Sequence, residues 1–232
     1  MAGGAVVGAL VLGAIAMLAG VAWVGLVLGA AVGAAMALWQ LRGTSARVLT
    51  SVGAVPIAAG SEPRLRNLVD GLCTSNGVSI PDLSVIEDDA INCLAVGASP
   101  QHTTIVVTRG MLAGLDRMQL EGVVAWLLGQ VKRGETRLAT VITPVAALAP
   151  RLAARALPER YDVIADLDAV GLTRYPPGLL AALEVTRSRS AVARAPQSSN
   201  HLWFDDPAGG TTGVGAAFHS SIDERIATLQ EL

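Results

Sequence analysis

The sequence predicts an α+β domain attached to an N-terminal transmembrane helical hairpin. No charged residue precedes Arg42 in this 232-residue chain. Beyond that point, short runs rich in β-branched residues occur, of which residues 103–108 (Thr-Thr-Ile-Val-Val-Thr) are the clearest strand. An apolar stripe at helical spacing follows over residues 120–131. We therefore expect a small antiparallel sheet with several helices.

The uncharged segment is long enough to cross a membrane twice. About 40 helical residues extend for about 60 Å, twice the roughly 30 Å of a hydrocarbon core. We expect spans near residues 4–20 and 23–40. The second span carries Gly25, Gly29 and Gly33 at four-residue spacing, which lets helix backbones approach closely in lipid.

The flanking charges predict how the hairpin is oriented. Arg42 and Arg47 follow the second span, and the positive-inside rule places them on the cytoplasmic side of the plasma membrane. A multi-pass hairpin then leaves the N-terminus and the bulk of the chain cytoplasmic. Cys73 and Cys93 are compatible with a reducing compartment. The net charge of −2 gives no basic footprint, so nucleic acid is not an expected partner.

The sequence divides into a hairpin over residues 1–42, a linker over 43–60 and a domain over 61–232. Within the domain, the apolar stretch 139–157 is interrupted by Pro144 and Pro150, and it is too short for a clean membrane span. We expect a helix there that lies against the membrane or the domain. Apolar periodicity, turn residues and strand runs predict the remaining elements: helices at 63–73, 160–166, 177–183 and after Ser221, strands at 83–86, 93–96 and 103–108, a polar loop at 187–200, and a buried cluster at 202–204.

The helix at 120–138 resembles the active-site helix of the HtpX-type membrane zinc metalloproteases, a gluzincin family. That family places an H-E-x-x-H zinc motif in this frame. The five motif positions read Trp126, Leu127, Leu128, Gly129 and Gln130 here. Shorter matches occur in the same order along the chain, at residues 91–97, 108–112, 160–166 and 218–226.

The resemblance implies roles for residues outside this helix. Asp162 stands at the position of the third zinc ligand. Asp166, His219, Glu224 and Arg225 stand at positions that the family also uses. The strand Asn92, Cys93, Leu94, Ala95 and Val96 corresponds to an edge strand beside the family's cleft, where a peptide could bind by strand addition. The alternative is a purely structural strand.

The residues at the motif positions lack the family's chemistry. Two histidines four residues apart grip zinc, and the intervening glutamate takes a proton from the bound water. The Trp126 indole nitrogen is only a donor, Leu127 is no base, and Gln130 offers a weak neutral oxygen. We therefore expect no metal or other cofactor and no enzymatic activity. Trp126 and Leu127 should be buried where zinc and water lie in active relatives, and Asp162 and Asp166 should form caps, salt bridges or solvent contacts.

The resulting prediction is a catalytically inactive relative of a membrane metalloprotease that acts as a scaffold or accessory subunit. Its expected partners are the lipid bilayer and other integral membrane proteins, in a larger membrane complex or with an active protease paralogue. Two alternatives stay open: an active membrane hydrolase with an atypical site, and a membrane anchor protein unrelated to proteases. No nucleophile and base constellation is visible around His102, His201 or His219.

Overall fold

The computed structural model describes residues 7, 8, 10, 11, 13, 14, 27–33, 43–158, 160–209 and 217–232. Backbone contacts divide the chain into residues 1–44 and 45–232. In the first unit the described positions before residue 43 are helical; Gly29 is buried and Gly33 is half-buried. Gly25 and most of the two expected spans lie outside the described residues. Over the described ranges, no helix combines the length and apolarity needed to cross a membrane.

The stretch expected to be a linker contains ordered elements. Helix α3 (Thr44–Ser51) and strand β1 (Val55–Pro56) lie within residues 43–60. Val48 and Val52, four residues apart, belong to a buried cluster that also contains Ile86 and Val106. Within the stretch expected to be a linker, this helix therefore contributes an apolar face to the core of the domain.

The sheet contains four strands in the order β1-β2-β4-β3, with β2 at Asp82–Ile86, β3 at Cys93–Ser99 and β4 at His102–Thr108. Strands β3 and β4, both predicted, form an antiparallel hairpin. Strands β2 and β4 pair in parallel, with Leu83 opposite Ile105. The sheet is therefore mixed, and the antiparallel prediction was wrong. The hairpin inserts β4, rather than β3, beside β2, so these two neighbours run in the same direction.

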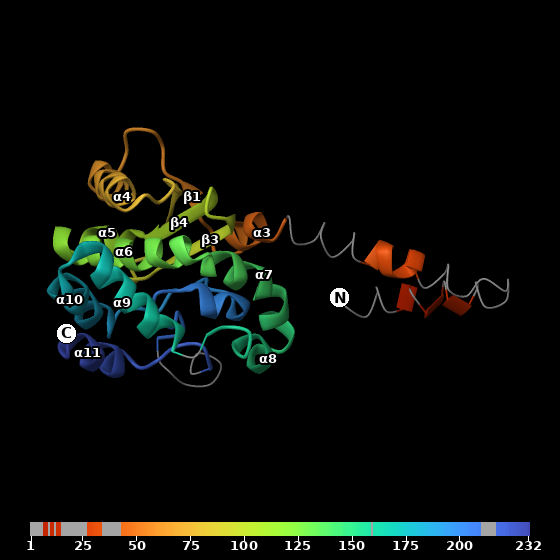
Figure 1. Ribbon diagram of the computed structural model, residues 1–232. Helices are drawn as coiled ribbons and strands as arrows, with labels where there is room; N and C mark the ends of the chain where they lie inside the picture. The colour runs from red at the N-terminus through yellow and green to blue at the C-terminus, as the bar shows by residue number, and fades with distance from the viewer. Residues whose placement is uncertain are drawn as a thin grey trace. The chain divides into compact units, whose positions relative to one another are not determined.

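The helices of the second unit are α4 (Pro63–Asn76), α5 (Arg109–Gly114), α6 (Arg117–Arg133), α7 (Glu135–Leu148), α8 (Pro150–Ala154), α9 (Tyr161–Thr173), α10 (Pro176–Thr186), the 3-10 helix η1 (Gln197–Leu202) and α11 (Ile222–Gln230). Figure 1 shows α9 and α10 beside α6. The predicted helices at 63–73, 160–166, 177–183 and after Ser221 are all present. Trp203 and Phe204 are buried as predicted.

Both faces of the sheet are buried. Leu83, Ile105 and Val107 belong to one core cluster with residues of α4 and α6. Ile86 and Val106, whose side chains point to the opposite face, belong to a second cluster with residues of α3 and α7. Because strand side chains alternate between faces, this double burial explains why apolar residues occur at consecutive positions, as in residues 105–107.

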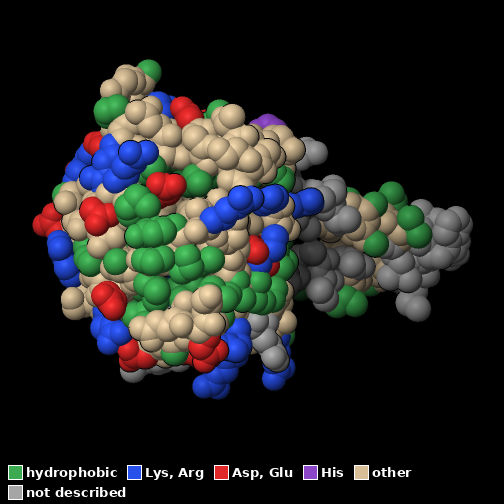
Figure 2. Space-filling view, turned by 60° about the vertical axis from the view of Figure 1, so that its left-hand side comes forward, with side chains coloured by type: hydrophobic (Ala, Val, Ile, Leu, Met, Phe, Trp, Pro, Cys, Tyr) green, Lys and Arg blue, Asp and Glu red, His purple; other side chains and the backbone are tan. Residues whose placement is uncertain are grey.

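Apolar side chains also gather on the surface. Figure 2 shows a band of hydrophobic side chains across one face of the molecule, with charged side chains around it. Large apolar side chains exposed in the second unit include those of Met118, Leu148, Leu152, Leu167 and Tyr175. Contiguous apolar surface of this kind commonly marks contact with a protein or a membrane.

His201 gives the fold a pH dependence that can be measured. The ring is buried, and Nε2 donates a hydrogen bond to the Ala139 carbonyl at 2.8 Å. Burial disfavours the charged ring and lowers the pKa of His201 to about 4, against about 6.5 in an unfolded chain. Since the unfolded state binds the proton more readily, stability falls as the pH drops from about 6.5 towards 4.

We expect the parent to lose about 2 kcal/mol more stability than His201→Gln between pH 7 and pH 5. Urea unfolding at both pH values measures the free energy of unfolding of each protein. Comparing how much each protein loses between the two pH values removes the contribution of the other titrating groups. Equal losses in the two proteins would show that His201 is protonated as readily in the folded state as in the unfolded chain.

Candidate functional site

Capping interactions at both ends determine where helix α6 begins and ends. A capping box begins it: Asp116 Oδ1 accepts from the Gln119 amide at 2.9 Å, and Gln119 Oε1 accepts from the Asp116 amide at 2.8 Å. Gly134, with a φ of 75°, ends it. A Cβ on Gly122 would lie 2.7 Å from the Leu179 backbone nitrogen, so this glycine allows α10 to pack closely. The motif positions 126–130 therefore lie in the buried middle of the helix.

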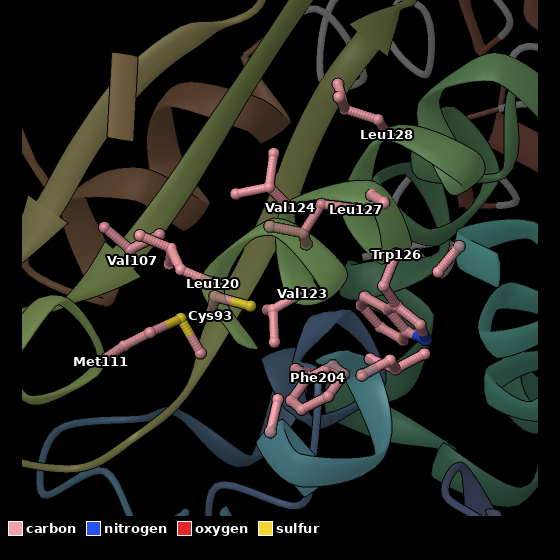
Figure 3. Close-up of a cluster of buried hydrophobic side chains, with 14 of the residues drawn as sticks. Cys93, Val107, Met111, Leu120, Val123, Val124, Trp126, Leu127, Leu128 and Phe204 are labelled. Atoms are coloured by element: carbon pink, nitrogen blue, oxygen red, sulfur yellow. The ribbon is translucent and has the colours of Figure 1, made fainter. Parts of the chain in front are cut away.

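Trp126 is fully buried and held on several sides. Its Nε1 donates to the Asp162 carbonyl at 3.3 Å. The indole meets Phe204 edge-to-face, with ring centroids 5.0 Å apart, and meets Tyr161 at 6.5 Å. Figure 3 shows Trp126 and Phe204 together in the apolar core. Leu127 is fully buried too. The prediction that both side chains are buried is confirmed.

Gln130 occupies the second ligand position and forms one buried hydrogen bond. Its Oε1 accepts from the Tyr161 hydroxyl at 2.7 Å, while its Nε2 has no partner among the described residues. Burial raises the pKa of Tyr161 well above its usual range, so this phenol stays protonated and remains a donor. Gln130 therefore links α6 to the start of α9.

A double-mutant cycle measures this link. Tyr161→Phe should cost about 1–3 kcal/mol of stability because it leaves both ends of the buried Gln130 amide without a partner. Gln130→Leu should cost a similar amount, since the Tyr161 hydroxyl then loses its acceptor. The double variant should be more stable than the two single losses predict, because no polar group is left unpaired. Urea denaturation of the four proteins tests it; additive losses would contradict the bond.

Asp162 makes a structural connection. Its Oδ1 accepts from the Val163 amide at 2.9 Å, and its Oδ2 accepts from the Ser220 amide at 2.7 Å. The carboxylate thus joins the first turn of α9 to the segment before α11. The expectation of a capping role for Asp162 agrees with this arrangement.

The residues at the family's ligand positions do not fit a zinc ion. The Trp126 nitrogen is a donor already engaged with a carbonyl, and the Gln130 oxygen accepts from Tyr161. Both Asp162 oxygens already accept backbone N–H groups. Within the described ranges, no three or more His, Cys, Asp or Glu side chains are grouped so that they could hold a metal ion. Tetrahedral zinc coordination by this set is therefore not supported.

Asp166 and Arg225 form a buried, two-pronged ion pair. Arg225 Nε lies 2.8 Å from Asp166 Oδ2, and its Nη2 lies 2.6 Å from Oδ1. Arg225 Nη1 also donates to the Phe204 carbonyl at 2.7 Å, and the guanidinium lies 4.6 Å from the Phe204 ring centroid. We call Trp126, Tyr161, Asp166, Phe204 and Arg225 the Trp126 cluster. The expected salt bridge of Asp166 is present, but its partner was not predicted from the sequence.

His219 and Glu224 lie near this cluster in separate arrangements. His219 is buried, with Nε2 donating to the Asn200 carbonyl at 2.8 Å. It lines a pocket of about 400 Å³ together with Arg155, Asp162 and Ser220. Ser221 caps α11 by accepting from the Glu224 amide. The Glu224 carboxylate pairs with Arg160 at 2.8 Å and does not close a capping box.

The strand considered for peptide binding does not offer an open edge. Asn92, Cys93, Leu94, Ala95 and Val96 are all buried. On the outer side of β3, the Cys93 carbonyl accepts from the Phe204 amide at 2.8 Å, and the Gly97 amide donates to Thr140 at 3.0 Å. The purely structural alternative fits this arrangement, since a peptide would have to displace these bonds.

Asn92 has a structural role that sequence reasoning missed. Its Nδ2 donates to the carbonyls of Ser190 and Asp205, both at 2.9 Å, and its Oδ1 accepts from the Cys93 amide at 2.9 Å. The side chain therefore joins the start of β3 to two loops that lie about a hundred residues further along the chain. A single asparagine before a strand gives no sequence signal for such distant carbonyl partners.

Known proteins that share one name are similar in sequence to most of this chain. No family model matches the chain. A protein of Dictyoglomus thermophilum named Protease HtpX homolog is 31% identical over 208 residues, covering 72% of this chain and 69% of the relative. Proteins of the same name from Tropheryma whipplei and Listeria innocua are 27% and 26% identical, covering 78% and 90% of this chain and 76% and 86% of those relatives.

These relatives confirm the resemblance read from the motifs. They contradict the prediction that the chain is not an enzyme, because all of them are named as proteases. That prediction rested on the residues at a single motif, which describe one way of holding zinc and do not decide the activity of the whole protein.

Proposed function

Because the chain belongs to the HtpX protease family, we propose that it works in proteolysis at a membrane as a scaffold or accessory subunit of a membrane protein complex. The observation that carries this proposal is the packing of α6. The helix holds the family's motif frame, yet Trp126 and Gln130 bind α9 there. The helix thus stabilises the domain instead of holding a metal, and the domain can act by binding partners on its surface. Hydrolysis of peptide bonds in such a complex has to use catalytic groups other than a zinc ion held at these positions.

Two further features support membrane contact and protein binding. The uncharged segment before Arg42 has the length of two membrane spans. The domain also exposes several large apolar side chains, a feature common at interfaces. The partners in this proposal are the lipid bilayer and other integral membrane proteins, including an active protease paralogue.

A pulldown in mild detergent tests the subunit role. Tagged full-length chain should retain integral membrane proteins in near-stoichiometric amounts, and the assembly should be larger than the chain alone in size-exclusion chromatography. An untagged strain is the control for adventitious capture. Cleavage of casein by the assembly and by the separated chain is then compared. Recovery of the chain alone as a monomer that cleaves casein unaided would overturn the subunit role.

Hydrolysis at an atypical site is the second candidate. The names of the relatives favour it, and the pocket beside Asp162 contains two groups able to move protons, His219 and Ser220. If the separated chain cleaves casein, Ser220→Ala and His219→Gln should each lower the rate sharply. Unchanged rates in both variants would place the activity elsewhere.

The membrane orientation is a prediction of its own. With both Arg42 and Arg47 cytoplasmic, Ser45→Cys should be shielded from a membrane-impermeant maleimide in intact cells and should react after permeabilisation. The background is low because Cys73 and Cys93 are buried, and desolvation raises the pKa of Cys73 to about 11. Labelling of Ser45→Cys in intact cells would reverse the orientation.

A further inference from the structure

Helix α7 carries its larger apolar side chains on the side that faces away from the core. Its buried face is made mostly of small or polar residues: Thr136, Ala139, Thr140, Ile142, Thr143 and Ala146. The exposed face presents Leu138, Val145 and Leu148. An amphipathic helix in a water-surrounded domain normally shows the opposite arrangement. The outer face would therefore be more stable in an apolar environment than in water.

The exposed apolar surface is greatest where α7 meets α8. The chain bends at Ala149, and Figure 1 shows the two helices meeting at a corner of the domain. Leu148 is 76% exposed and Leu152 is 59% exposed, with Val145 at 42% one turn earlier. Two leucines that protrude this far from adjacent helices form an apolar tip rather than a scattered pair of surface residues.

The charges within residues 136–158, the stretch that contains this tip, all have one sign. Between residues 136 and 158 the charged residues are Arg137, Arg151 and Arg155, with no aspartate or glutamate. All three arginines are exposed, and none forms an ion pair within the described residues. An apolar tip beside unpaired cations matches the layering of an anionic membrane surface, where phosphates lie directly above the acyl chains.

Helix α3, where the chain enters the domain, contributes to the same buried cluster as α7. Helix α3 begins at Thr44, two residues after Arg42 and the end of the uncharged segment. Val48 of α3 and Val52, directly after it, share this cluster with Ala139, Ile142 and Ala146 on the buried face of α7. A domain attached to a membrane through residue 44 therefore has its attachment in the part of the fold to which α7 belongs.

We propose that the outer face of α7 and α8 rests on an anionic lipid bilayer, with Leu148 and Leu152 at the level where acyl chains begin and Arg151 and Arg155 against lipid phosphates. The surface is an interfacial contact and not a membrane span. This inference rests on the membrane location in the proposed function. Beyond the proposed function, it states which face of the domain contacts the lipid and that this face prefers anionic lipids.

Fluorescence on reconstituted full-length chain tests the contact. Leu152→Cys is labelled with the environment-sensitive dye NBD, since the two native cysteines are buried. Ile80→Cys, at an exposed apolar side chain between α4 and β2, is the matched control. The vesicles are phosphatidylcholine alone or phosphatidylcholine with phosphatidylglycerol. Iodide in the buffer and spin-labelled lipid in the bilayer serve as quenchers.

With phosphatidylglycerol present, we expect spin-labelled lipid to quench the label at position 152, and iodide to reach it poorly. The label at position 80 should show the reverse. Replacing both Arg151 and Arg155 by glutamine should shift the label at position 152 towards the buffer, lowering the docking equilibrium about fivefold for each arginine removed. In phosphatidylcholine alone the arginine variants should behave like the parent.

Three outcomes would overturn the contact. In the first outcome, iodide reaches the label at position 152 in both kinds of vesicle, while the chain resists alkaline extraction. This face then points into water, although the chain is in the membrane. Shielding from iodide without quenching by lipid means that protein, such as a second copy, covers the face. Release of the chain by alkaline extraction removes the membrane location, and the proposed function fails together with the contact.

Discussion

Restoring the family's zinc motif should destabilise this domain strongly and should not create a stoichiometric zinc site. The variant is Trp126→His, Leu127→Glu and Gln130→His. Truncating a buried tryptophan to alanine costs about 3–5 kcal/mol, and a histidine recovers part of that volume. The glutamate adds an unpaired carboxylate at a fully buried position, which costs several kcal/mol more. Since a domain is typically stable by about 5–15 kcal/mol, most of the stability should be lost.

Guanidinium unfolding followed by circular dichroism measures the loss, and elemental analysis measures zinc. Trp126→Phe is the matched control, because it keeps an aromatic ring and loses the bond to the Asp162 carbonyl. It should cost about 1–2 kcal/mol. A triple variant that unfolds like the parent and holds one zinc per chain would show that the space around α6 is free to accept a metal.

Asp166→Ala should lower the free energy of unfolding by about 3–5 kcal/mol, because it leaves the buried Arg225 guanidinium without its carboxylate. The matched control is Asp168→Ala, which removes a partly exposed pair with Arg133 and should cost about 1 kcal/mol or less. Replacing both partners, by Asp166→Leu and Arg225→Met, should lose less than Asp166→Ala alone, since no charge is then buried unpaired. If the double variant is the less stable of the two, the pair itself contributes more than its desolvation costs.

The sequence predicted the elements whose signal is local. The apolar stripe over residues 120–131 identified helix α6 and the burial of Trp126, because a period of 3.6 residues shows which side chains face the core. Strands β3 and β4 were predicted from two short runs rich in apolar and β-branched residues. Helix α3 was missed because its eight residues contain few large apolar side chains, Val48 and Leu49, which are too few to show a helical period.

Features that depend on distant parts of the chain were not predictable. The parallel pairing of β2 with β4 follows from strand order, which the strand sequences themselves do not carry. The Phe204 amide that covers Cys93 comes from more than a hundred residues away. Asp166 and Arg225 are 59 residues apart, and nothing in either helix alone identifies the other as its partner.

The same difference between local and long-range features applies to the candidate site. The residues at positions 126, 127 and 130 showed which metal ligands are missing, because ligand chemistry belongs to the side chain itself. They did not show what the chain does, and the relatives corrected the prediction of no enzymatic activity. The proximity of groups from different elements, such as His219 and Asp162 around one pocket, comes only from the fold.

The two edges of the sheet affect how the protein associates with copies of itself. Strand β1 has only two residues and ends at Pro56, which has no N–H to donate. At the other edge, the Phe204 amide and Thr140 already bond to β3. Exposed edges are the usual template for edge-to-edge aggregation, and this sheet offers none of useful length within the described residues. At high protein concentration, copies of the folded domain should therefore stay free of β-aggregates.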